Sequence, residues 1–210
     1  MTRARVNQTT PPPLTIIPSF PMTHADIVAA LKEKFPSGVL STLEFRGEHT
    51  VMVLKSSLAA VLQECRDSLG FEALIDITTI DQMGSDPRFE IVYELYSYAS
   101  NLSLRIKSAT SEDEAEFPSV TSVWPAANWH EREAYDMMGV RFSGHPELKR
   151  ILMWEGYPFF PLRKEFPLAG KASEMPDVAF TDAAPLQGGP FITSPGAGDT
   201  VTREPRAKGA

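Results

Sequence analysis

The sequence predicts an α+β fold: a two-layer domain, with a mainly antiparallel or mixed sheet and helices on one face, followed by an extended C-terminal arm. Three observations lead to this prediction. Apolar residues recur at helical spacing in residues 24–35 and 58–69. They alternate with polar residues in three later segments, as in antiparallel strands that expose one face to water. Beyond Met153 neither pattern persists.

The expected elements follow one another closely from Thr23 onward. The Thr23 side chain can cap the first helix, and Gly47-Glu48 is the turn of a predicted hairpin. Gly70 is expected to close the second helix, and Gly139 the last one. In order, the sequence predicts helix 24–35, strands 39–46 and 49–55, helix 58–69, strands 71–80, 89–98 and 101–107, and helix 126–138. The acidic stretch 111–116 is either a turn or the start of a helix that ends near Trp124.

Changes in composition divide the chain into four segments. Residues 1–22 are rich in proline and are expected to form a flexible leader. Residues 23–140 form the α+β domain, which ends in a charged helix. Residues 141–168 mix prolines with large apolar residues and are expected to be an arm that becomes ordered on a partner. Residues 169–210 are a Pro/Gly-rich tail, expected to be poorly ordered or bound to a partner.

The overall composition excludes several functions. The chain has 27 acidic and 20 basic residues and a net charge of −7, which disfavours a general nucleic-acid binder. A single cysteine, Cys65, excludes an internal disulfide framework, a Cys-rich zinc site and an iron–sulfur cluster made by this chain alone. Cys65 lies on an apolar helix face and is expected to be a core residue. No apolar run approaches the roughly 20 residues that cross a bilayer.

The densest polar segment is residues 127–140, and its residue types allow three kinds of site. A metal site would use His130, Glu133 and His145, but the chain lacks a second histidine at helical spacing. Acid–base catalysis by Glu131 and Glu133 is disfavoured, because positions two apart on a helix point about 200° apart. Tryptophan, tyrosine and methionine interleave with the charges, as they do in protein interfaces. We therefore interpret this helix as a covered surface rather than a solvated one, with Arg132 and Asp136 close enough to pair.

The stretch from Trp124 to Leu168 resembles the signature of the 30-kDa subunit family of respiratory complex I, the NADH:quinone oxidoreductase. The order of the preceding elements agrees, so the resemblance extends over residues 24–168. One departure is Phe160, where the family usually has a histidine, and Pro158-Phe159 replace a more polar pair. The matching residues are Trp129, Glu131-Arg132-Glu133, Asp136, Gly139, Phe142, Gly144-His145-Pro146, Leu148, Arg150-Ile151-Leu152, Pro161-Leu162-Arg163-Lys164 and Phe166-Pro167.

The resemblance implies a scaffold without a catalytic, cofactor-binding or metal-binding residue of its own. FMN and iron–sulfur clusters would reside in partner subunits of a complex that moves electrons from NADH to quinone and translocates protons. The partners would be chiefly the large subunit that shapes the quinone cavity and neighbouring cluster-bearing subunits. The chain would sit peripherally on the cytoplasmic side of the inner membrane and touch the membrane only through the complex. The expected interface residues are Trp129, Glu131, Arg132, Glu133, Asp136, Phe142, His145, Arg150, Trp154, Arg163 and Lys164.

Two alternatives remain open from sequence alone. The equivalent subunit of a membrane-bound hydrogenase, a formate-hydrogenlyase or a plastoquinone-linked complex would carry a similar signature, since the identity of the substrate is set by the partner subunits. A stand-alone metal-dependent hydrolase is the alternative from a different class, and it would require the metal site described above.

Overall fold

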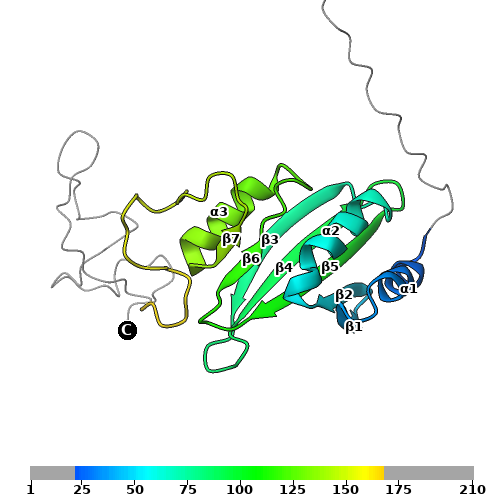
Figure 1. Ribbon diagram of the computed structural model, residues 1–210, viewed down its shortest axis with the longest axis horizontal. Coiled ribbons are helices and arrows are strands. Elements are labelled where there is room, and N and C mark those ends of the chain that lie inside the picture. The colour runs from blue at the N-terminus through cyan, green and yellow to red at the C-terminus, as the bar shows by residue number, and fades with distance from the viewer. Residues whose placement is uncertain (1–21, 168–210) are drawn as a thin grey trace, which may run out of the picture.

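The protein is an α+β domain in which helices cover a five-stranded sheet, as the computed structural model shows for residues 22–167 (Figure 1). The predicted fold class is confirmed. The elements are α1 (His24–Lys34), β1 (Val39–Phe45), β2 (Glu48–Val53), a short 3-10 turn (Lys55–Ser57), α2 (Leu58–Asp67), β3 (Ala73–Asp81), β4 (Phe89–Ser97), β5 (Leu102–Thr110), β6 (Glu116–Pro118), α3 (Ala127–Met138) and β7 (Arg141–Ser143).

The main sheet is mixed, with the strand order β1-β2-β5-β4-β3. Three neighbouring pairs are antiparallel, as the hairpin turns dictate. The fourth pair, β2 with β5, is parallel and places Val51 opposite Ile106. This pairing inserts the β1–β2 hairpin beside β5, so β3 becomes the free strand at the opposite edge of the sheet.

One hydrophobic core joins all three helices to one face of this sheet. Thr23 and Asp26 form a reciprocal capping box that begins α1, and Ile27 and Leu31 then point into the core. Cys65 of α2 is fully buried in the same core, and burial raises the pKa of its thiol. The expectation that Cys65 is a packing residue is therefore confirmed. The opposite face of the sheet carries ion pairs such as Glu90 with Lys107 at 2.7 Å, which agrees with a wetted face.

A second, two-stranded sheet was not anticipated. β6 pairs in parallel with β7, with Phe117 opposite Phe142, and both rings are buried in the core. Residues 111–115 precede β6 as turns and irregular structure, so of the two expectations for the acidic stretch the turn is correct. Residues 141–143 thus belong to the domain and are held there by strand pairing.

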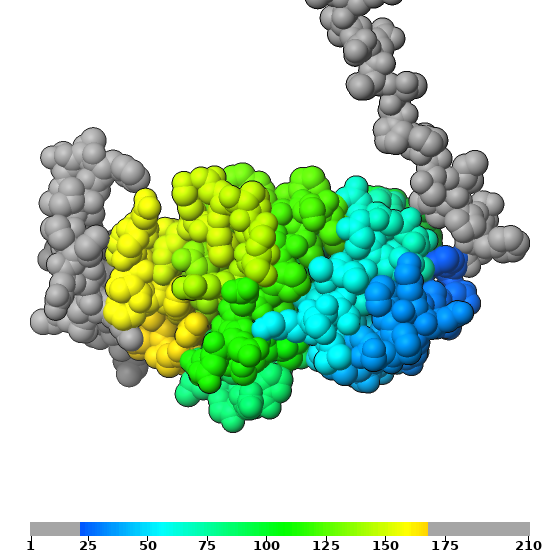
Figure 2. Space-filling model, in the orientation of Figure 1, coloured from blue at the N-terminus to red at the C-terminus, as the bar shows by residue number. Residues whose placement is uncertain are grey.

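Residues 144–167 continue without regular structure and lie against the domain itself. Figure 2 shows this segment, coloured yellow to orange, as a layer at one end of the molecule. The N–H of Leu162 donates to the carbonyl of Met137 in α3 at 3.1 Å. The N–H of Lys164 donates to Asp81 at the end of β3 at 2.9 Å. The segment is therefore ordered on its own domain, in contrast to the arm that becomes ordered on a neighbour. We call residues 144–167 the strap.

Other expectations concern segments outside the described residues. The leader, apart from Met22, and the tail after residue 167 both lie there. Within residues 22–167, no helix is long and apolar enough to cross a membrane.

Candidate subunit interface

Helix α3 positions most of the predicted interface residues beside the free edge strand β3. The helix ends at Gly139, which adopts a left-handed conformation (φ 74°) and whose N–H donates to the carbonyl of Tyr135. Such a cap favours glycine because a Cβ is strained there. Here a Cβ would also lie only 2.6 Å from the ring of Phe160, so the strap packs directly on the end of the helix.

Glu131 points inward from α3, although its sequence context marked it as a surface acid. Its side chain is 0% exposed. One carboxylate oxygen accepts from the N–H of Val120 and the other from the hydroxyl of Ser119, each at 2.7 Å. Burial raises the pKa of Glu131 from its usual 4.5 to about 7, because desolvation outweighs these two hydrogen bonds. Glu131 therefore fixes the loop before α3 onto the helix.

His145 lies next to this carboxylate, and its side chain is buried as well. Its Nδ1 accepts from the N–H of Glu147 at 3.0 Å, so the ring proton of the neutral imidazole resides on Nε2. Nε2 faces the carbonyl of Asn128 at 3.3 Å and the Glu131 carboxylate at 3.9 Å. His145 thereby ties the start of the strap to the beginning of α3.

Asp136 forms a second internal junction, and its side chain is 0% exposed. Oδ2 accepts from three consecutive N–H groups, those of residues 151–153, at 2.7–2.9 Å. Oδ1 accepts from Arg150 at 2.6 Å. Burial acts to raise the pKa of Asp136, but the hydrogen bonds outweigh it and hold that pKa below its usual range. The expected pairing of Asp136 with Arg132 is wrong.

Arg150 and Arg132 both bind backbone carbonyls instead of serving as free surface charges. Arg150 donates to the carbonyls of Tyr157 and Phe159 in addition to Asp136. Its guanidinium lies over the ring of Phe160 at 5.1 Å, at the position where the family usually has histidine. Arg132 donates to the carbonyls of Lys149 and Arg150 at 3.1 and 3.2 Å. Both arginines therefore shape the strap.

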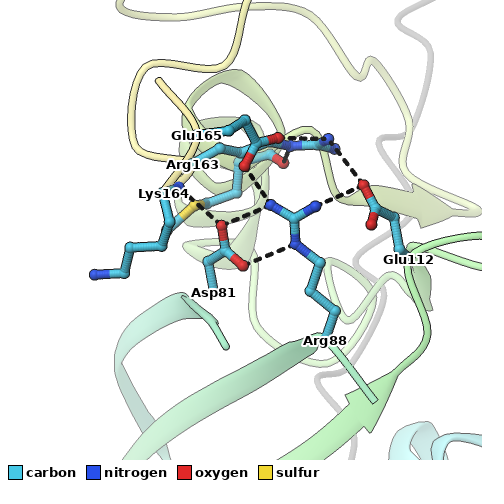
Figure 3. Close-up of polar contacts among 7 residues, drawn as sticks. Asp81, Arg88, Glu112, Arg163, Lys164 and Glu165 are labelled. Atoms are coloured by element: carbon cyan, nitrogen blue, oxygen red, sulfur yellow. Dashed lines mark hydrogen bonds and ion pairs between the residues drawn. The ribbon is translucent and has the colours of Figure 1, made fainter. Parts of the chain in front are cut away.

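A third junction, which we call the Arg88 cluster, holds the end of the strap (Figure 3). Arg88 is paired with Asp81 through two hydrogen bonds of 2.9 Å, and it also contacts Glu112 at 2.6 Å and Glu165 of the strap. Hydrogen bonds from Arg88 lead the effects that hold the pKa of Asp81 below its usual range. Arg163 lies beside this cluster and donates to the carbonyl of Met138 at 2.7 Å.

The sequence analysis missed the Arg88 cluster. Asp81 and Arg88 stand in the turn between two predicted strands, where charged residues are ordinary. Their distance in sequence from Glu165 gave no signal of a contact. Of the two predicted residues here, Arg163 points inward, whereas Lys164 contributes its backbone N–H while its side chain points away from the cluster (Figure 3).

The structure thus separates the predicted interface residues into two groups. The inward group builds the fold and the strap. The outward group is exposed or half-buried and remains able to contact another protein. Trp129 is 60% exposed and lies under the guanidinium of Arg132 at 5.1 Å, and Trp154 is 39% exposed. The inward group is Glu131, Asp136, Phe142, His145, Arg150 and Arg163, and the outward group is Trp129, Arg132, Glu133, Trp154 and Lys164.

The residues of the alternative metal site do not converge. His130 Nδ1 lies 3.1 Å from Asp76 of β3, whereas His145 is enclosed on the side of Glu131. Glu133 is exposed. Over residues 22–167, no group of three or more histidine, cysteine or acidic side chains is arranged to hold a metal ion.

The fold and these junctions define a structural domain whose buried charges hold its own C-terminal strap in place. Comparison with known proteins identifies the family. Residues 51–172 match the model of the "Respiratory-chain NADH dehydrogenase, 30 Kd subunit". The chain belongs to this family.

Named relatives and solved structures agree with this assignment. The chain is 45% identical over 147 residues to an NADH-quinone oxidoreductase subunit of Geotalea uraniireducens, covering 70% of this chain and 90% of that relative. It is 38% identical over 162 residues to the protein of the same name in Roseiflexus sp., covering 76% and 90%. A trypsin-resistant fragment of Nqo5 superposes with a TM-score of 0.52 at 29% identity, covering 58% of this chain and 98% of the fragment. A chain of an archaeal membrane-bound sulfane sulfur reductase, at 24% identity and a TM-score of 0.60 over 69% of this chain and 85% of that one, shares the fold.

Proposed function

We propose that this chain is the 30-kDa scaffold of an NADH:quinone oxidoreductase, a peripheral-arm subunit that is active only within the complex. The observation that carries the proposal is the family match over residues 51–172, which runs from the sheet through α3 and the whole strap. The region that the family has in common is therefore the region that the three internal junctions hold together. The names of the relatives favour this complex over the hydrogenase and plastoquinone-linked alternatives.

The geometry of the acids supports a scaffold. A catalytic carboxylate must reach a substrate or a water molecule, yet Glu131 and Asp136 are fully buried and occupied by hydrogen-bond donors of the chain itself. Their charges hold the loop before α3 and the strap in fixed positions. This arrangement serves recognition, because a rigid surface loses little conformational freedom when a partner binds.

The outward group supplies the proposed contact surface. Exposed tryptophans beside arginine are typical of the residues that contribute most to protein interfaces. We propose that Trp129, Trp154 and the outer side of the strap face the large subunit that shapes the quinone cavity, and that residues 141–168 act as a partner-binding arm that is already ordered. FMN and iron–sulfur clusters would then belong to partner subunits. The chain would lie on the cytoplasmic side of the inner membrane and reach the membrane through the complex.

Affinity purification tests this proposal. A tagged chain purified from gently solubilised native membranes is expected to bring with it a flavin- and cluster-containing assembly that oxidises NADH with a quinone. The same chain purified alone is expected to be colourless and inactive. Recovery of the chain without companions, or with a hydrogenase in place of an NADH-oxidising subunit, would contradict the proposal.

A further inference from the structure

A small groove lies between the free edge strand β3 and helix α3, and none of the junctions described above uses it. Its volume is about 70 Å³, which suits a single inserted side chain rather than a small-molecule ligand. Figure 1 shows the two elements side by side at the end of the sheet. The groove is lined by Asp76, Ile77, Thr78 and Thr79 of β3, Glu133, Ala134, Met137 and Met138 of α3, and Leu162 of the strap.

The polar groups of this groove call for a positively charged donor. Its lining includes two carboxylates, Asp76 and Glu133, and neither lysine nor arginine. Asp76 already faces His130 at 3.1 Å. Glu133 is exposed and has no ion pair or hydrogen bond to any residue in the range 22–167. An unpaired carboxylate in the wall of a groove favours a cation there.

An independent observation comes from Thr79. This residue is 6% exposed and lines the groove, yet its hydroxyl has no hydrogen-bond partner among the described residues. Buried hydroxyl groups nearly always have a partner, and an unsatisfied one is costly. A donor placed in the groove would satisfy the Thr79 oxygen and the Glu133 carboxylate together.

The surroundings of the groove are apolar. Ile75 and Ile80 of β3 are 54% and 39% exposed, and Trp129 of α3 and Leu162 of the strap are 60% and 56% exposed. A free cation in solution would leave these side chains in water, whereas a protein surface would cover them. The combination suits a basic side chain presented among apolar neighbours.

We propose that this groove receives a lysine or arginine side chain of another subunit, which donates hydrogen bonds to Glu133 and to the hydroxyl of Thr79. The inference rests on the proposed function, because it assigns a contact within that complex. It makes Glu133 a determinant of assembly rather than of folding, and it gives the buried Thr79 hydroxyl a partner that the isolated chain does not supply.

The test compares variants of the full-length chain for the yield of the complex purified from native membranes. Glu133→Lys is expected to lower the yield about tenfold or more, because it places like charges together. Glu133→Gln and Thr79→Val are each expected to lower it several-fold. Glu33→Lys, an exposed acid of α1 changed in the same way, is the matched control and is expected to assemble normally.

Thermal unfolding of the isolated variants separates assembly from folding. Thr79→Val is expected to leave the melting temperature unchanged or slightly raised, since it removes an unsatisfied buried group. A wild-type yield for Glu133→Lys, or an equal loss for Glu33→Lys, would overturn the inference while leaving the proposed function intact. Failure of the wild-type chain to recover any companion would overturn both.

Discussion

Asp136 and Arg150 form a buried ion pair that joins helix α3 to the strap, with Oδ1 and Nη1 separated by 2.6 Å. The same carboxylate binds three consecutive N–H groups, so it organises a turn of the strap as well as neutralising the arginine. Arg150 in turn binds carbonyls further along the strap. One acid therefore determines the path of a segment that lacks regular secondary structure.

Replacement of this acid is expected to destabilise the chain strongly. Asp136→Asn leaves Arg150 largely buried without a counter-charge, which costs about 3 kcal/mol of the free energy of unfolding. Urea unfolding of the variant against the wild type measures the loss. Asp113→Asn, in an exposed turn, is the control and is expected to change the free energy by less than about 0.5 kcal/mol. Similar losses for both variants would show that the buried pair contributes nothing specific.

Glu131 is expected to make stability depend on pH. Its pKa in the folded chain is about 7, above the usual 4.5, so the folded state holds the proton more tightly than the unfolded state. The stabilisation from this group is fully present below pH 4.5 and is lost as pH rises through 7, amounting to about 3 kcal/mol at most.

The variant Glu131→Gln removes this ionisation while keeping an oxygen that can accept from Val120. Compared with the wild type, it is expected to gain relative stability between pH 5 and pH 8, as measured by urea unfolding at the two pH values. Other groups titrate equally in both proteins, so they cancel in the comparison. Parallel pH profiles of the two proteins would contradict the prediction.

Gly139 and Gly84 offer a matched pair for measuring how tightly the strap packs. Both have a positive φ, 74° and 88°, so alanine is strained at each position. Only at Gly139 would the new Cβ meet the ring of Phe160, whereas nothing lies within 4 Å at Gly84. Gly139→Ala is expected to cost about 1–3 kcal/mol more than Gly84→Ala in unfolding free energy. Equal costs would mean that Phe160 moves aside freely.

Trp129 is expected to matter for assembly and not for folding. It is 60% exposed, so Trp129→Ser should change the free energy of unfolding by less than about 1 kcal/mol. If it contacts a partner, its loss should cost about 2 kcal/mol of binding or more, seen as a lower yield of the purified complex. Tyr98→Ser, at an aromatic residue that is 69% exposed on the β4–β5 turn, is the control. Equal yields for both variants would remove Trp129 from the interface.

The fold was predictable where the pattern of residues is local. Alternation in β4 and β5, the apolar stripes of α1 and α2, and the glycine after α3 each indicated one structure. The parallel pairing of β2 with β5 was not predictable in detail, because alternation shows which face of a strand is buried and not which neighbour lies at its edge. Strands as short as β6 and β7, three residues each, leave no recognisable period.

The site was predictable in its residues but not in their directions. Helical spacing suggested that Asp136 pairs with Arg132, four positions away, whereas its partner is Arg150, which is brought close only by the path of the strap. Glu131 stands between charged neighbours, so its sequence context did not indicate burial. In both cases tertiary packing decides which side of the helix is covered, and a helical pattern with acids on several faces does not contain that information.

The parallel pairing of β2 with β5 also determines when the sheet can close. Val51 and Ile106 are partners, and the chain between them must first form α2, β3 and β4. Contacts so distant in sequence form late, since the entropy of closing a long loop must be overcome before they stabilise anything. During synthesis, the β1–β2 hairpin therefore waits for β5 to emerge from the ribosome. Over that interval the inner edge of β2 is open to other strands, and a chaperone that shields this edge would act at the slowest step of folding.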